Sequence, residues 1–234
     1  MKALTIDTSN LVMGVAVTED DRILGEVITN LKKNHSIRLM PAISDLMKEV
    51  NMQPKELDRI IVANGPGSYT GVRIGVTTAK TMAWSLNIPL VGVSSLEVLA
   101  QNGRYFNGVI SPLFDARRGQ VYTGLYKSNQ GQVENIENDR IIQLTDWLEM
   151  LKQQKDEVLF IGNDLPLHQQ LIEEQLQTKA VFASGSQHNP RPSELALIGI
   201  SRDAIDNVHE FVPEYLRLAE AEAKWLESQQ GKVD

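Results

Sequence analysis

Short apolar runs alternate with polar turns and with longer stretches of helical spacing along this chain. The first three runs are joined by short polar turns, which predicts a strand meander. Apolar residues three or four positions apart follow from Leu39 to Val50 and predict an amphipathic helix with Ser36 at its N-cap. The three predicted strands are residues 3–6, 12–17 and 23–28.

The stretch from Arg59 to Pro89 reads as a buried strand, a glycine-rich turn and a helix. Small residues recur every four positions in that helix and therefore form one stripe. A glycine inside a helix costs about 1 kcal/mol relative to alanine, so another backbone should approach the stripe closely. That backbone belongs either to the chain's own sheet or to a partner, and the spacing leaves both open. The stripe consists of Gly71, Gly75, Ala79 and Ala83.

The second half of the chain repeats the hairpin of the first, with a turn at Asp115–Gly119, which predicts two similar lobes. We assign residues 1–102 to an N-terminal lobe and residues 103–215 to a second lobe. A C-terminal helix over residues 216–229 is expected to pack back on the N-terminal lobe. The strands expected after the meander are 60–63, 90–93, 108–114, 120–126, 158–161 and 180–183, and the helices 71–86, 96–99, 144–152, 167–176, 192–203 and, within the last segment, 219–227.

The glycine turn invites interpretation as a phosphate loop, but no lysine followed by serine or threonine completes that motif. Arg73 falls in the first turn of the predicted helix, where a cation faces the positive end of the helix dipole. It therefore needs either an anion or a carboxylate nearby, and both interpretations stay open.

Asp7 and Asp115 stand where the phosphate-binding hairpins of an actin-like ATPase would begin. Such hairpins use glycine so that backbone amides reach phosphate, whereas Leu11, Arg117 and Arg118 are bulky. The bulk argues against a close phosphate cradle, although the arginines could attract an anion at longer range. A stand-alone ATPase or kinase is the alternative function on these residues.

Composition narrows the chemistry further. The absence of cysteine excludes disulfides, thiolate metal sites and a cysteine nucleophile. The four histidines are scattered, so we expect no metal site and no catalytic residue, and a metallopeptidase is the weakest alternative. The net charge of -7 disfavours nucleic-acid binding by the chain alone. With no signal-like segment and no apolar run of roughly 18 residues, we expect a cytoplasmic protein without a membrane span.

Several motifs together resemble the TsaB (YeaZ) family. These are IDTSN, NHSIRLMPAI, ANGPGSYTGVRIG, SSLEVLA, DARRGQVY and VPEYLR, which extend over nearly the whole chain. The resemblance implies an α/β, two-lobed actin-like ATPase (ASKHA, ribonuclease H-like) fold with a degenerate active site. Chains of the TsaD type hold a metal through a histidine pair, and here the pair would be His35 and Leu39, so the metal site is not carried over.

The resemblance also implies a role. The chain is expected to be a non-catalytic scaffold or activator subunit in the formation of tRNA N6-threonylcarbamoyladenosine, forming a heterodimer with the catalytic subunit TsaD. TsaE is expected to join them, TsaC to make the threonylcarbamoyl-adenylate, and the chain to form a homodimer when alone. Contact with tRNA is expected only through the complex. No intrinsic cofactor is expected, and ATP or ADP only at the complex interface.

Two sets of site residues follow from these interpretations. The hypothesised partner interface is the helix pair with Leu39, Met40, Ile43, Met47, Gly71, Gly75, Ala79, Met82 and Ala83. The residues expected near an anion or nucleotide are Arg73, Arg117 and Arg118.

Overall fold

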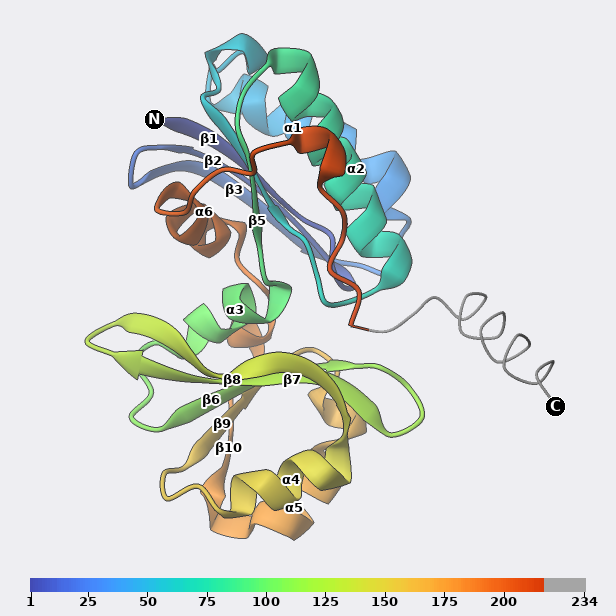
Figure 1. The fold of residues 1–234 in the computed structure, drawn as a ribbon, viewed down its shortest axis with the longest axis vertical. Helices are drawn as coiled ribbons and strands as arrows, with labels where there is room; N and C mark the ends of the chain where they lie inside the picture. The colour runs from blue at the N-terminus through green and yellow to red at the C-terminus, as the bar shows by residue number, and fades with distance from the viewer. Residues whose placement is uncertain (217–234) are drawn as a thin grey trace, which may run out of the picture.

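The computed structural model describes residues 1–216 and contains two lobes, each built on a five-stranded sheet (Figure 1). The helix expected over 216–229 lies outside the described residues except for Leu216. None of the helices among residues 1–216 is long and apolar enough to cross a membrane.

The N-terminal sheet has the strand order β3-β2-β1-β4-β5. β2 runs antiparallel to β1 and β3, while β4 and β5 run parallel to β1. β1 and β4 are buried at nearly every position, and alternate residues of a strand point to opposite faces of the sheet. Both faces of this sheet are therefore covered by helices. The strands are β1 (Lys2–Asp7), β2 (Val12–Glu19), β3 (Arg22–Asn30), β4 (Arg59–Ala63) and β5 (Leu90–Val93).

The second sheet repeats that order as β8-β7-β6-β9-β10, again with an antiparallel meander followed by two parallel strands. This duplication confirms the predicted two-lobed α/β fold. The long edge strand β8 was not predicted, because polar side chains cover most of it and its apolar spacing is weak. The strands are β6 (Val109–Asp115), β7 (Gln120–Asn129), β8 (Gln132–Gln143), β9 (Val158–Ile161) and β10 (Ala180–Phe182).

Helices cover both faces of the N-terminal sheet (Figure 1). α1 (His35–Glu49) and α2 (Tyr69–Leu86) pack on the face formed by residues such as Leu4 and Val62. α6 (Pro192–Ile200) packs on the opposite face, where Leu195 meets Ala3 and Ile61. α1 begins at His35 and continues through Pro41, and its N-cap is Asn34 rather than the predicted Ser36, because the Asn34 side chain accepts a hydrogen bond from the Ser36 amide.

The second sheet is likewise enclosed. α4 (Leu144–Lys152) and α5 (Gln169–Leu176) bury Trp147 and Ile172 against one face. α3 (Ser95–Ala100) covers the other face, where Leu96 and Leu99 pack with residues of β6 and β9.

The chain therefore crosses between the lobes twice, which corrects the predicted boundaries of 1–102 and 103–215. α3 lies in the first range yet packs on the second sheet, and α6 lies in the second range yet packs on the first. The physical reason is that each sheet has two apolar faces, whereas local sequence spacing shows only that a helix is amphipathic.

A segment from Ile205 to Leu216, here called the C-terminal strap, follows α6 along the N-terminal lobe and contains one short 3-10 helix, η6 (Val208–Glu210). The Ile205 amide donates to the Leu90 carbonyl at 2.9 Å, and the Glu214 amide donates to the Asn64 carbonyl at 2.7 Å. An added Cβ at Gly65, whose φ is 115°, would overlap the carbonyl oxygen of Glu214. The strap thus passes directly over the glycine-rich turn before α2.

Candidate partner-binding face and inter-lobe cleft

The small-residue stripe of α2 faces the chain's own sheet. An added Cβ at Gly71 would overlap the carbonyl oxygen of Thr8, and one at Gly75 would meet Thr8 Oγ1 at 2.6 Å. Ala79 and Ala83 are also fully buried. The prediction that these four residues touch a partner is therefore wrong. The close backbone that the spacing demanded is that of the turn after β1.

Three residues of α1 need the same correction. Leu39, Ile43 and Met47 are buried in the core that α1 and α2 share with the N-terminal sheet. Met82 is half-buried and packs against that core. Of the nine residues proposed for the interface, only Met40 is clearly exposed, at 49%. The helical spacing of apolar and small residues indicated the inner face of the helix pair, since that face carries most of the apolar residues.

The outward side of the same helix pair is nevertheless apolar in part, and we call it the helix face. Ile37, which lies outside the apolar spacing of α1, is 71% exposed, and Met40 lies three positions further along the helix. Beside them a groove of about 440 Å³ is lined by hydroxyl groups, one tyrosine, one arginine and one isoleucine. The lining residues are Ser36, Tyr69, Thr70, Arg73, Ile74, Thr77 and Thr78.

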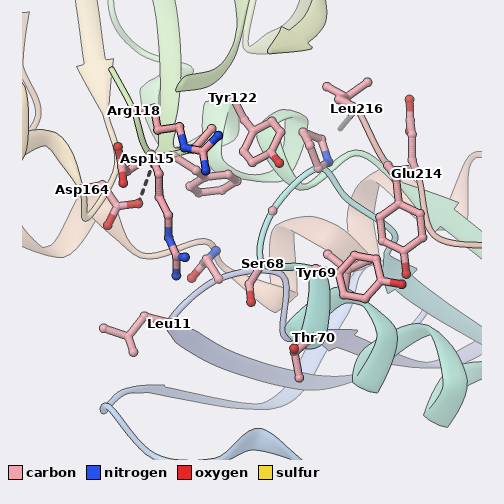
Figure 2. A pocket seen from close by; sticks show the side chains of 18 residues that line it. Leu11, Ser68, Tyr69, Thr70, Asp115, Arg118, Tyr122, Asp164, Glu214 and Leu216 are labelled. Atoms are coloured by element: carbon pink, nitrogen blue, oxygen red, sulfur yellow. Dashed lines mark hydrogen bonds between the residues drawn. The ribbon is translucent and has the colours of Figure 1, made fainter. Parts of the chain in front are cut away.

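A larger cleft of about 710 Å³ lies between the lobes. Figure 2 shows Asp115, Asp164 and Arg118 on the wall from the second lobe and Ser68, Tyr69 and Thr70 on the other. Ser68 is the N-cap of α2, so the positive end of an 18-residue helix opens toward this space.

The turn between β6 and β7 brings Arg117 and Arg118 to the cleft. Arg117, Arg118 and Gly119 all have positive φ, at 64°, 56° and 74°. Both arginines are exposed, and both line the cleft. Their expected position near an anion remains a prediction.

The two aspartates that suggested an ATPase differ in environment. Asp7 is only 2% exposed, and its Oδ1 accepts hydrogen bonds from the amide and hydroxyl of Ser9 at 2.9 and 2.7 Å. Burial raises the pKa of Asp7 above its ordinary value, against the lowering effect of the Ser9 donors. Asp7 does not line the cleft wall, because its side chain is enclosed beneath the turn that follows β1.

Asp115 lines the cleft and accepts a hydrogen bond from His168 Nε2 at 3.1 Å. Its backbone amide donates to Asp164 Oδ2 at 2.9 Å. Burial raises the pKa of Asp164, and the nearby Asp115 carboxylate adds to the rise. Among residues 1–216, no group of three histidine, aspartate or glutamate side chains is arranged to hold a metal ion.

Arg73 has an aromatic partner. Its guanidinium lies 5.3 Å from the centre of the Tyr69 ring, and its Nη1 donates to the Tyr69 hydroxyl at 3.2 Å. Tyr215 of the C-terminal strap stacks on the same ring at 4.8 Å. A tyrosine four residues before an arginine on a helix is a signal that could have predicted this pair, because such residues are neighbours on the helix surface. Tyr215 carries no comparable sequence signal.

Comparison with known proteins agrees with this architecture. Residues 22–225 match the family model described as TsaD, tRNA N6-adenosine threonylcarbamoyltransferase. The chain is also 59% identical over 229 residues to the Bacillus subtilis protein named tRNA threonylcarbamoyladenosine biosynthesis protein TsaB. That alignment covers 98% of this chain and 100% of the relative. The chain belongs to the TsaB family.

Other members of the TsaB family are more distant. The Escherichia coli protein of the same name is 30% identical over 135 residues, which cover 57% of this chain and 58% of the relative. The solved structure of YeaZ from Pseudomonas aeruginosa superposes with a TM-score of 0.76 at 24% identity, covering 92% of this chain and 99% of that one. This superposition shows that the two chains share their fold.

Proposed function

We propose that this chain is a non-catalytic scaffold subunit in tRNA N6-threonylcarbamoyladenosine formation and that it binds and activates TsaD through its helix face. Membership in the TsaB family supports the pathway. The observation that carries the contact is the exposure of Ile37 and Met40 beside the groove on α1 and α2. Exposed apolar side chains next to a polar, hydroxyl-lined groove are typical of a protein interface.

The non-catalytic role is supported by the surroundings of the residues at the positions where a metal site or an ATPase site would lie. The position of the second metal-binding histidine in TsaD-type chains is Leu39, which is buried in the core. His35 Nε2 donates to the Asn10 carbonyl at 2.8 Å, so it is engaged with backbone. Asp7 is enclosed by the turn that follows it.

A charge placed on the helix face tests the contact. Met40→Glu should weaken binding to TsaD roughly tenfold or more, because an apolar anchor at an interface would be replaced by a desolvated charge. Tyr105→Glu is the matched control, since Tyr105 is 91% exposed and lies in the segment before β6, outside α1 and α2. Calorimetric titration with purified TsaD measures both, and equal affinities of the two variants would place the contact elsewhere.

Reconstitution tests the role itself. We expect tRNA modification by TsaD, TsaE and TsaC to require this chain, and the chain alone to be inert. Modification at full rate without it would overturn the scaffold role, and the homodimer and the recruitment of TsaE can be followed in the same mixtures by sizing chromatography.

The absence of an intrinsic cofactor is part of the proposal. Mg-ATP should produce no binding heat with the isolated chain, and ATP or ADP should bind only once TsaD is present. Micromolar binding to the isolated chain, with turnover lost in Asp115→Ala, would instead favour the ATPase or kinase interpretation.

A further inference from the structure

Two residues at the start of α2 line both the inter-lobe cleft and the groove on the helix face. These residues are Tyr69 and Thr70. The first turn of α2 is therefore the ridge between the two hollows, and Figure 2 shows both residues at the edge of the cleft. Whatever fixes the Tyr69 side chain shapes the two surfaces together.

Tyr69 is 43% exposed, so packing in the core does not hold it in place. Its ring contacts two side chains, the guanidinium of Arg73 at 5.3 Å and the ring of Tyr215 at 4.8 Å. Arg73 is itself exposed, its guanidinium contacts the ring and hydroxyl of Tyr69, and its charge also acts on the phenol of Tyr215, where it opposes the rise in pKa that burial causes. The cation in the groove lining thus lies in a cluster with two tyrosine rings, and Tyr215 is the member of that cluster that belongs to the C-terminal strap.

The C-terminal strap positions Tyr215 through contacts with the turn that precedes α2 and with α2 itself. The preceding residue, Glu214, is bonded to the Asn64 carbonyl and lies against Gly65. Further back, Lys80 Nζ donates to the carbonyls of His209 and Phe211 at 3.0 and 2.6 Å. The middle of the strap is therefore bonded to Lys80 of α2, and the part of the strap near Glu214 is bonded to the glycine-rich turn.

From this arrangement we propose that Tyr215 is a positioning residue for the helix face. It holds the Tyr69 ring, and through it the Arg73 guanidinium, in the geometry that a protein partner binds. The inference rests on the proposed function for the identity of that partner. A side chain already fixed before binding loses less conformational entropy on association, so removing its support lowers affinity although the supporting residue lies outside the groove.

The test uses the full-length chain and purified TsaD with three variants. Tyr215→Ala removes the stacked ring, Tyr215→Phe keeps it, and Val212→Ala is a control in the same strap at an exposed residue. We expect Tyr215→Ala to weaken TsaD binding about fivefold, which corresponds to the loss of one aromatic pair. Tyr215→Phe and Val212→Ala should bind like the unmodified chain. In the absence of TsaD, amide exchange at residues 69–74 should become faster only in Tyr215→Ala.

The two measurements separate this inference from the proposed function. If the unmodified chain binds TsaD but Tyr215→Ala binds equally well, the inference is wrong and the proposed function stands. If the unmodified chain does not bind TsaD, the proposed function fails, and exchange at residues 69–74 still decides whether Tyr215 positions Tyr69. Unchanged exchange in Tyr215→Ala overturns the inference in either case, and Tyr215→Phe behaving like Tyr215→Ala overturns the role of ring stacking.

Discussion

The inner and outer faces of α2 have opposite chemistry and opposite neighbours. The inner face is a stripe of glycine and alanine that lies against the turn after β1 and the N-terminal sheet. The outer face carries hydroxyl groups, Arg73 and the exposed Trp84, and it borders the groove. The inner face is occupied by the chain's own sheet and turn, whereas the outer face is partly exposed and partly covered by the C-terminal strap, which contacts Tyr69, Lys80 and Trp84.

This difference shows what a small-residue stripe does and does not indicate. The spacing correctly indicates that a backbone comes close to the helix, because only glycine or alanine leaves room there. It does not identify the chain to which that backbone belongs. Burial decides the question, and it assigns the stripe to the packing of the chain's own fold.

The largest expected effect comes from filling the inner face. Gly71→Leu should destabilise the fold by more than about 3 kcal/mol, because a Cβ at this position already overlaps the backbone of Thr8. Thr77→Leu on the outer face is the matched control and should change stability by at most about 0.5 kcal/mol. Chemical denaturation of the two variants measures this, and similar midpoints would contradict the assignment of the two faces.

An intermediate, pH-dependent effect is expected at Asp7, beneath the inner face. Burial raises the pKa of Asp7 in the folded state above the unfolded value of about 3.9. The neutral carboxyl therefore favours folding below that pH, and this contribution is lost as pH rises through the raised pKa. Asp7→Asn, which does not titrate, should gain stability relative to the unmodified chain as pH rises from 4 to 7. The gain is about 1.4 kcal/mol for each unit of pKa shift.

Urea denaturation at several pH values measures this difference. Parallel stability curves for Asp7→Asn and the unmodified chain would show that Asp7 has an ordinary pKa in the folded protein.

The smallest expected effect is at the boundary between α2 and the C-terminal strap. Lys80→Met removes two hydrogen bonds to strap carbonyls and should cost about 1 kcal/mol, mostly as faster amide exchange in residues 205–216. Lys48→Met is the control, since the Lys48–Asp45 pair at 3.8 Å is highly exposed and should contribute little. Equal exchange in the two variants would mean that Lys80 does not anchor the strap.

Most strands and helices could be predicted from the sequence, since apolar spacing follows the period of each element. The meander, α1, α2 and the second hairpin lie where the pattern placed them. β8 was missed because an edge strand exposed to solvent need not be apolar. The crossings of α3 and α6 could not be predicted, because spacing identifies an apolar helix face but not the sheet that it covers.

The candidate site was predicted only in outline. The residues that the sequence indicated on α1 and α2 lie mostly on the inner side of these helices, and of the nine only Met40 is clearly exposed. Arg73 was expected to need an anion or a carboxylate, whereas it lies over the ring of Tyr69. A contact with an aromatic face satisfies a cation without any opposite charge, so charge considerations alone do not find it.

The crossing of α6 onto the first sheet has a consequence for synthesis of the chain. Leu195 of α6 covers the face formed by Ala3, Ile61 and Val91, and it lies more than a hundred residues later in the sequence. A nascent chain therefore exposes this apolar sheet face until α6 has left the ribosome, although all five strands of that sheet are complete by Val93. The N-terminal lobe is consequently finished last, and a fragment that ends before α6 should aggregate during translation.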